Sequence, residues 1–170
     1  MSKSEFLLLI PGLIYGVGLV ELMRILNRKM YWEIIAWSIV MFLSLIVQWF
    51  GLYDRLEFLE LNMGIFTLLL INPLLFTRIC HTLSPHEDVV DTELYFKNER
   101  PVFFALLSLS LISGLILQYV LMDDGLGGLR FVILPLVIAC IFVHGKWIRV
   151  LALLFFISAA AFIFIKGYAG

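Results

Sequence analysis

Glu21 is the first residue whose type and position could support chemistry inside a membrane, because it lies in the apolar stretch that begins at Phe6. A carboxylate in hydrocarbon is costly, so an ionisable group there is a functional hypothesis by default. Arg24 lies one helical turn away, and Arg78 approaches the same depth on a later apolar segment. The favoured interpretation is a structural ion pair that locks two helices at their inner ends. Proton or cation handling is the alternative.

Asn72 and Pro73 interrupt another apolar segment near its middle. Pro73 removes an amide donor and frees a carbonyl one turn back, and Asn72 offers polar groups at the same level. We favour a kink whose polar groups are satisfied by neighbouring helices. The alternative is that this break lines a cavity in a transporter.

Three amides lie in the outer thirds of their predicted helices, namely Gln48, Asn62 and Gln118. They could form a polar layer that joins three helices. Hydrogen bonds between such side chains are worth only about 0.6 to 2 kcal/mol each. The layer would therefore specify packing, and substrate binding is the alternative.

Metal-capable side chains gather in one short stretch that contains Cys80, His81, His86, Glu87, Asp88 and Asp91. Their spacing fits no standard zinc or calcium loop, so a solvated face is the favoured interpretation. The sequence contains no Ser-His-Asp order, phosphate-cradling glycine loop or His-Glu-x-x-His helix. We therefore predict no catalytic residue, no metal site and no cofactor.

Small residues recur at four-residue spacing on several segments, as in Gly12-x-x-x-Gly16, Ser110-x-x-x-Gly114 and Ser158 to Ala161. Such faces let helix backbones approach closely, either within one bundle or across an oligomer.

The elements that must position these residues are membrane-spanning helices. The 170 residues are 62% hydrophobic and 15% charged, whereas an ordinary soluble domain is about half apolar and a quarter charged. Apolar runs of about 20 residues recur, which is typical of transmembrane helices. We predict an all-α, polytopic membrane helix bundle that forms a single transmembrane domain over residues 1–170. Its six transmembrane helices are expected at about 5–26, 32–53, 58–80, 101–122, 129–144 and 147–166. The fifth is the shortest.

A polar connector, residues 81–100, divides the chain into two hydrophobic halves. Ser84, Pro85 and Glu87 form a helix-start pattern, with a capping Ser, a Pro at the first helical position and a Glu three residues after the cap. Val90 and Leu94 then fall on one face. The pattern predicts a short amphipathic cytoplasmic helix between spans three and four. Its acidic character favours docking onto the protein's own Arg and Lys side chains over lipid binding.

The distribution of basic residues predicts the orientation. One side of the predicted bundle collects eight of them, Arg24, Arg28, Lys29, Arg78, Lys97, Arg100, Lys146 and Arg149. The other side collects Lys3, Arg55, Arg130 and Lys166. The first side should therefore be cytoplasmic, with both termini outside. The net charge of −1 provides no field that would recruit nucleic acid.

Two stretches resemble small bacterial six-span membrane proteins of unassigned function. They are Glu-Phe-Leu-Leu-Leu-Ile to Gly-Val-Gly-Leu-Val-Glu-Leu at the start, and Glu-Leu-Tyr-Phe-Lys-Asn-Glu-Arg-Pro-Val-Phe-Phe-Ala-Leu in the second half. The resemblance implies a multi-pass protein of the bacterial inner (cytoplasmic) membrane. It implies no known activity and no catalytic residues.

Three functional classes follow. The preferred one is a non-enzymatic membrane protein that acts as a sensor, a scaffold or a subunit of a membrane assembly. Its partners would be the lipid bilayer and either a second copy or another membrane subunit. The second class is a small oligomeric channel or transporter that uses Glu21 and Asn72. The third, an intramembrane enzyme, has the least support because no paired acids or metal ligands converge at one depth.

Overall fold

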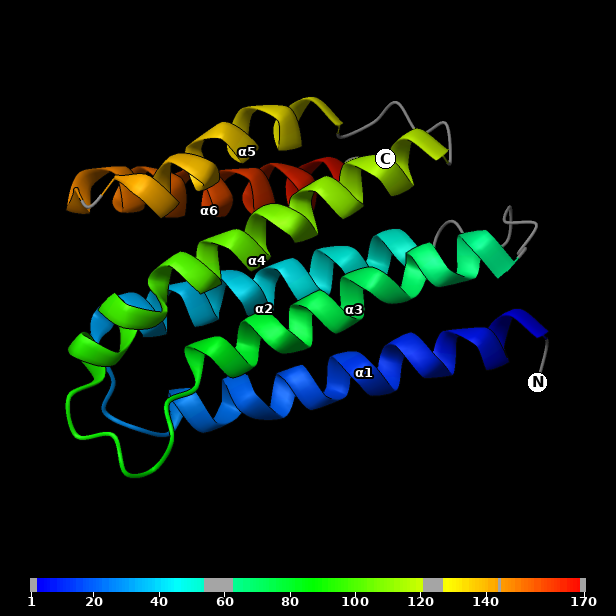
Figure 1. Ribbon diagram of the computed structural model, residues 1–170. Coiled ribbons are helices and arrows are strands. Elements are labelled where there is room, and N and C mark those ends of the chain that lie inside the picture. The colour runs from blue at the N-terminus through cyan, green and yellow to red at the C-terminus, as the bar shows by residue number, and fades with distance from the viewer. Residues whose placement is uncertain (1–2, 54–62, 121–126, 144, 169–170) are drawn as a thin grey trace.

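The computed structural model describes residues 3–53, 63–120, 127–143 and 145–168. Within these ranges the chain forms six α-helices and no strand. The helices are α1 (Lys3–Leu26), α2 (Trp32–Tyr53), α3 (Met63–Leu83), α4 (Thr92–Val120), α5 (Gly127–Phe142) and α6 (Lys146–Tyr168). The predicted all-α bundle is confirmed. Figure 1 shows that successive helices run in alternating directions, so the connections after α1, α3 and α5 lie at one end of the bundle. We call this end the connector end.

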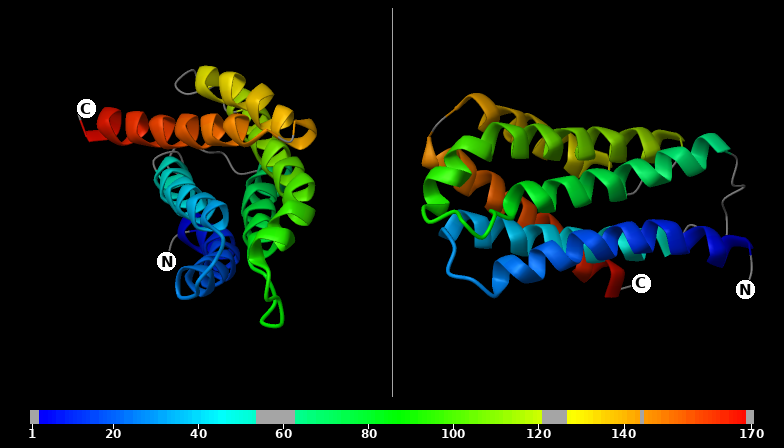
Figure 2. Two further views of the ribbon diagram at one scale, coloured as in Figure 1. Left: turned by 90° about the vertical axis from the view of Figure 1, so that its left-hand side faces the viewer. Right: turned by 60° about the horizontal axis from the view of Figure 1, so that its bottom comes forward.

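The helices pack in a closed order around the bundle. Helix α3 packs most extensively, against α1 on one side and α4 on the other, and α4 then packs against α5 and α5 against α6. Helix α2 closes the order through contacts with α6, α1 and α3. Figure 2 shows that α6 crosses the other helices steeply and that its C-terminal end projects away from them.

Five of the six helices are long and apolar enough to cross a membrane, judged by length and composition among the described residues. Their apolar windows are Leu9–Leu26, Trp32–Trp49, Gly64–Leu83, Thr92–Tyr119 and Lys146–Ile163. Helix α5 has only a shorter apolar stretch, Arg130–Phe142. A bundle of apolar, span-length helices is thus observed, and the sixth complete span stays a prediction.

The core is built around Trp37 of α2, which is almost fully buried. Its ring lies 5.3 Å from Phe103 and 5.3 Å from Phe104 of α4, and 5.8 Å from Phe156 of α6, measured between ring centroids. All three pairs are edge-to-face, the arrangement in which a ring edge meets a ring face of opposite partial charge. Trp37 therefore joins α2 to two helices that come much later in the chain.

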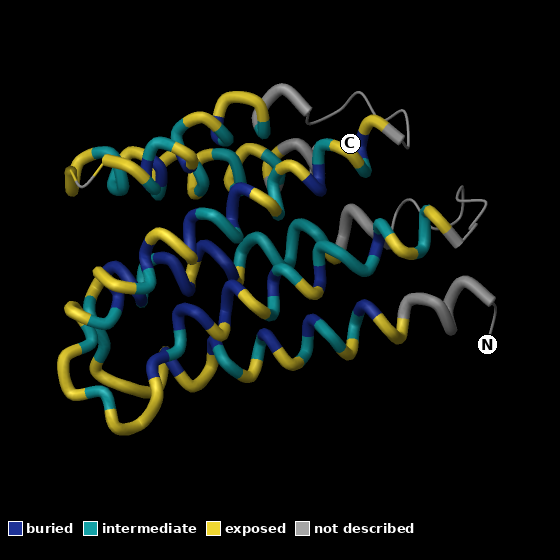
Figure 3. Tube along the Cα trace, in the orientation of Figure 1, coloured by how far each residue is buried: buried dark blue, intermediate teal, exposed yellow. Residues whose placement is uncertain are grey.

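Buried side chains concentrate in the half of the bundle nearest the connector end. Each helix presents one buried face there, and exposed and buried positions alternate along the chain (Figure 3). The fully buried members include Leu22, Ile25, Ile34, Ile79, Leu83, Phe103, Phe104, Val137, Cys140 and Ala152. The connector end is consequently the tightly packed part of the structure, so a change of side-chain volume has its largest effect there.

The predicted amphipathic helix between spans three and four is wrong. Helix α3 continues to Leu83, the next residues form turns, and α4 begins at Thr92 and runs without a break. Asp91, not Ser84, caps this helix: its Oδ1 accepts hydrogen bonds from the backbone amides of Glu93 (3.1 Å) and Leu94 (2.9 Å). Because Asp91 caps the helix in place of Ser84, the helix starts later in the chain than predicted. An Asp at the cap position accepts hydrogen bonds from first-turn amides that otherwise lack partners.

The expected apolar face of that helix is also absent. Val90 is 98% exposed and Leu94 is 55% exposed, whereas Phe96 is buried. Helix α4 begins before the predicted start of span four, so that Pro101 lies inside the helix. This earlier start places Phe96 on the helix, where it packs in the core. The other predicted span bounds coincide with the helix ends or differ from them by at most three residues. The predicted start of span three and the predicted ends of spans four and five lie outside the described residues.

Two glycines of α1 give a matched test of this packing. A Cβ added at Gly18 would lie 2.7 Å from the buried Phe76 ring of α3, whereas one added at Gly16 would meet no atom within 4 Å. Gly18→Ala should therefore destabilise the fold by about 1–3 kcal/mol through overpacking. Gly16→Ala should be neutral or slightly stabilising, since alanine is the better helix former. Denaturant titrations in micelles measure both variants, and equal losses would contradict this packing.

Candidate functional site

Glu21 forms a local ion pair. Its Oε2 lies 3.4 Å from Nη1 of Arg24 on the same helix, and the two side chains are 20% and 50% exposed respectively. The second expected partner, Arg78, is exposed and makes no ion pair with any described residue. The predicted link from Glu21 to the third helix is therefore not observed, and the pair with Arg24 does not join two helices.

The end of α1 contacts the connector between α3 and α4. Nη2 of Arg24 lies 3.7 Å from Oε1 of Glu87, and Nη2 of Arg28 donates a hydrogen bond to the Glu87 carbonyl at 3.4 Å. These contacts agree with the prediction that the acidic connector docks onto the protein's own basic residues. They are exposed and long, so each contributes little stability.

Asn72 lies well away from Glu21. Thr77 donates a hydrogen bond to the carbonyl of Ile14, which places the middle of α3 beside the middle of α1. Glu21 lies about two turns beyond that contact on α1, toward the connector end, and Asn72 lies on its other side. At 1.5 Å per residue the two side chains differ in depth by roughly 18 Å. The structure does not bring them to one site.

The side-chain oxygen of Asn72 is buried and has no hydrogen-bond partner among the described residues. Helix α3 continues through Pro73, which is itself buried. The expectation that neighbouring helices satisfy the polar groups of this break is therefore not met at Asn72.

The predicted layer of amides is only partly assembled. Gln48 accepts a hydrogen bond from the hydroxyl of Tyr15 on α1 at 2.7 Å. Gln118 lies 3.4 Å from Nη1 of Arg130 on α5, and Asn62 lies outside the described residues. Gln48 and Arg130 line one half-enclosed cavity of about 130 Å³ between α2, α4, α5 and α6. Arg130 is thus a member of this layer that the sequence pattern did not indicate.

Arg130 reaches this position because α4 has no side chain at Gly114. Nη1 of Arg130 donates a hydrogen bond to the Gly114 carbonyl, and a Cβ at that glycine would lie 2.9 Å from the same nitrogen. The small-residue face predicted on this helix therefore accommodates an arginine side chain.

The strongest polar arrangement in the described part of the chain involves residues that the sequence reasoning did not select. Glu33 on α2 is 1% exposed, and both of its oxygens face Arg149 on α6. Nε of Arg149 donates to Oε2 at 2.8 Å, and Nη2 donates to Oε1 at 2.9 Å. This bidentate geometry is the strongest form of a carboxylate–guanidinium pair.

Tyr31 completes the coordination of Glu33. Its hydroxyl donates to Oε1 at 3.1 Å, and its backbone amide donates to the side chain of Thr92 at the start of α4, at 3.0 Å. Burial, together with the adjacent Glu33 carboxylate, raises the pKa of the Tyr31 hydroxyl. The hydroxyl therefore keeps its proton and remains a donor throughout the physiological pH range.

Arg100 is the second arginine of this layer. It lies on α4, is 7% exposed, and its charge acts on Arg149, Glu33 and the buried Cys140 of α5. Its Nε is buried and has no hydrogen-bond partner in the described part of the protein. We call Tyr31, Glu33, Arg100 and Arg149 the buried charge layer.

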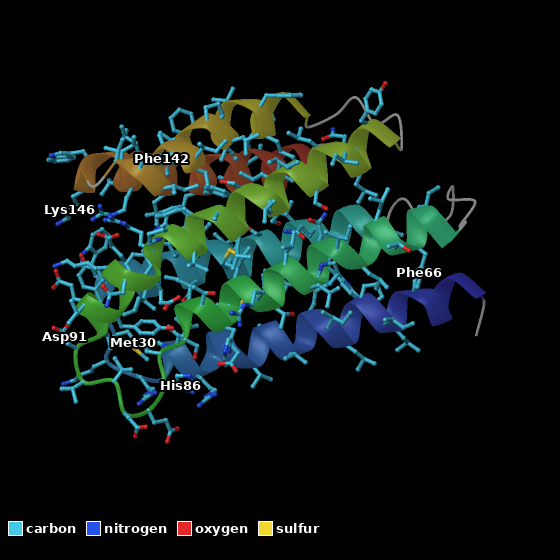
Figure 4. The ribbon with its side chains drawn as sticks, in the orientation of Figure 1. Met30, Phe66, His86, Asp91, Phe142 and Lys146 are labelled. Atoms are coloured by element: carbon cyan, nitrogen blue, oxygen red, sulfur yellow. The ribbon has the colours of Figure 1, made fainter. Side chains whose placement is uncertain are left out.

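The buried charge layer lies near the connector end, where several polar side chains of the chain gather. Figure 4 shows Met30, His86, Asp91 and Lys146 toward this end and Phe66 toward the other. At the surface beside the layer, the ammonium of Lys146 lies 5.1 Å from the centre of the Trp32 ring. The layer thus offers guanidinium donors in a largely buried site, an arrangement that suits the binding of an anion.

The one sequence signal for Glu33 is its spacing. Glu33, Trp37 and Met41 follow each other at four-residue intervals and all three are buried. A carboxylate on the same helical face as a core tryptophan must point into the bundle. It then needs a cationic partner from another helix. The spacing indicates the need for a partner but not which arginine supplies it.

Apart from the buried Cys80, the metal-capable stretch remains at the surface. His81 and His86 are exposed, with their ring centroids 6.3 Å apart. In the described ranges no three His, Cys, Asp or Glu side chains are grouped as metal ligands. The two cysteines, Cys80 and Cys140, are both buried and unbridged.

Comparison with known proteins adds no homologue. The chain matches no family model, and neither the curated proteins nor the solved structures give a match. The resemblance to small bacterial six-span proteins therefore stays a prediction, and the site must be interpreted from its own geometry.

Glu33 should be the most important polar residue for stability. Glu33→Gln removes the charge that compensates Arg149, and breaking a buried pair by losing one partner costs about 3–5 kcal/mol. Glu93→Gln is the matched control, because Glu93 pairs with Lys97 at 2.9 Å on the surface, with both side chains at least half exposed. An exposed pair of this kind contributes little to stability, because solvent screens it. Unfolding titrations in micelles should separate the two variants, and similar losses would contradict a buried structural pair.

Proposed function

We propose that this chain is a multi-pass integral membrane protein that acts without catalysis, as a subunit or scaffold of a membrane assembly. The proposed contact surface is the face of α1 that carries Gly12 and Gly16, and the proposed partner is a second copy of the chain. The observation that carries this proposal is an open apolar groove along that face.

The groove runs beside α1 and has a volume of about 620 Å³. Its lining is Leu9, Gly12, Leu13, Gly16, Val17 and Val20 of α1, with Trp49 of α2. A second open groove of about 360 Å³ lies on the α2 side of the same glycines and reaches Phe42, Leu45 and Ile46. The two glycines therefore form a shallow strip between two hollows.

The two glycines differ in how open their surroundings are. Gly12 is covered by Trp49, since an added Cβ there would lie 2.9 Å from its ring, whereas Gly16 faces open space. Helix association in membranes is driven by close backbone contact at small residues, because apolar side chains gain little by leaving lipid for protein. The strip at Gly16 offers such a contact to another helix.

The proposed location is the bacterial inner membrane, with the connector end in the cytoplasm and both termini outside. Its support is the excess of Lys and Arg at the connector end. The positive-inside rule assigns such an end to the cytoplasm.

Association is tested with a substitution that fills the groove. Gly16→Leu should abolish self-association, measured as energy transfer between labelled copies in lipid nanodiscs or proteoliposomes at several lipid-to-protein ratios. It should leave the fold intact, because the added side chain enters open space. Ser158→Leu is the matched control, since Ser158 is a small exposed residue on α6.

The proposal predicts association of the wild type and of Ser158→Leu, and none of Gly16→Leu. A wild type that stays monomeric at every ratio would contradict self-association. Loss of association in Ser158→Leu with retention in Gly16→Leu would assign the contact to α6 instead.

Orientation is tested with a cysteine at an exposed position. His86 lies in the connector, and the native cysteines Cys80 and Cys140 are buried. A membrane-impermeant maleimide should label His86→Cys in inside-out vesicles and not in right-side-out vesicles. The wild type in the same preparations gives the background, and the reverse pattern would contradict a cytoplasmic connector end.

A further inference from the structure

We propose that the guanidinium of Arg100 in the buried charge layer is a binding site for a singly charged phosphate group, taken either from a lipid phosphodiester or from free phosphate. The site is formed where α2, α4 and α6 meet near the connector end. It is independent of the α1 groove.

The buried charge layer contains more cations than acids. Glu33 is its acid, and Arg100 and Arg149 are its two cations. Glu33 uses one oxygen for Nε of Arg149 and the other for Nη2 of Arg149 and the hydroxyl of Tyr31. Glu33 thus directs its hydrogen bonds to Arg149 and Tyr31, and the layer carries one more cation than acid, with Arg100 reaching Glu33 only through a longer-range electrostatic interaction.

Arg100 is more than nine-tenths buried, without a hydrogen-bond partner at its Nε in the described part of the chain. It makes no ion pair with a described residue. A buried donor without a partner is unfavourable, and a buried charge without a counter-charge more so. Such a group in a native structure calls for a ligand or a solvent partner.

The guanidinium of Arg100 has the donor geometry that a phosphate group requires. A guanidinium presents its N–H donors as a planar fork that matches the oxygens of a phosphate group. A surplus of one positive charge is balanced by one negative charge, which a phosphodiester always carries. Basic pockets between membrane helices on the cytoplasmic side bind lipid head groups through this chemistry.

The site lies close to the connector end of the bundle. Arg100 lies about two turns inside the start of α4, and Glu33 and Arg149 lie in the first turns of α2 and α6. At 1.5 Å per residue, this depth is roughly 12 Å from the end of α4. In the orientation proposed above, the connector end lies at the cytoplasmic membrane surface, where the phosphates of lipid head groups are available to basic side chains. The Lys146 side chain on Trp32 adds a second cation at the rim.

The test uses Arg100→Met and the matched control Lys97→Met, which removes an exposed cation one turn away on the same helix. The proteins are purified in an uncharged maltoside detergent, in chloride buffers of constant ionic strength. The Tm is then measured against increasing inorganic phosphate and, separately, against a short-chain phosphatidylglycerol.

We expect a saturable rise in Tm for the wild type and for Lys97→Met, of about 5–10 °C at a hundredfold excess over Kd. Arg100→Met should show no rise. Without added anion, Arg100→Met should be at least as stable as the wild type, because it replaces an uncompensated buried charge by an apolar chain of similar length. Arg100→Lys keeps the charge without the fork and should respond only at higher anion concentration.

A response to both additives supports the phosphate site, a response to phosphatidylglycerol alone assigns it to lipid, and a response to phosphate alone assigns it to the free anion. The proposal is wrong if Arg100→Met responds like the wild type or if the wild type responds to neither additive. It is also wrong if Arg100→Met fails to fold, or is clearly less stable, in buffer without the anion. That result would mean that the charge already has a partner within the protein.

Discussion

The structure depends most on the requirement that a carboxylate buried among aromatic side chains must have a cation within hydrogen-bond reach. Glu33 and Arg149 meet this requirement with two hydrogen bonds of 2.8 and 2.9 Å across 116 positions of sequence. The pair fixes where the start of α6 meets the start of α2. One turn further along α2, Trp37 contacts Phe156 of α6 and two phenylalanines of α4. The aromatic cluster therefore positions the same two helices as the ion pair and adds α4 to them.

The helix dipoles act differently on the two partners. Glu33 lies in the first turn of α2, where the positive end of the helix favours a carboxylate. Arg149 also lies near the start of its helix, where the same effect is unfavourable to a cation. Arg149 is thus held at its position by Glu33 and not by its own helix. Helix α6 depends on this attachment, since only 11% of its apolar stretch Lys146–Ile163 is buried.

Sequence patterns predicted the helical architecture well because apolar runs of span length recur and each must form a helix to satisfy its backbone in lipid. They did not predict the connector, because Ser84 and Asp91 are both good caps and only the docking of Tyr31 on Thr92 and of Phe96 in the core selects the second. The site was harder to predict for a related reason. Glu21 was selected because it lies inside a predicted span, but it pairs with Arg24 on its own helix. The more deeply buried Glu33 lies close to a helix end, where a charge is ordinarily solvated.

The two halves of the bundle differ in the kind of partner that would complete their contacts. At the connector end the packing is dense, the polar contacts are specific, and the surplus charge at Arg100 needs an anion from outside the chain. Toward the other half of α1, the surface at Gly16 is apolar and open, and its shape needs a helix rather than a charge. A lipid phosphate would satisfy the first demand and a second copy the second, without competition between them. The membrane would then supply a component of the folded protein as well as its solvent, because the internal contacts of the chain leave both surfaces incomplete.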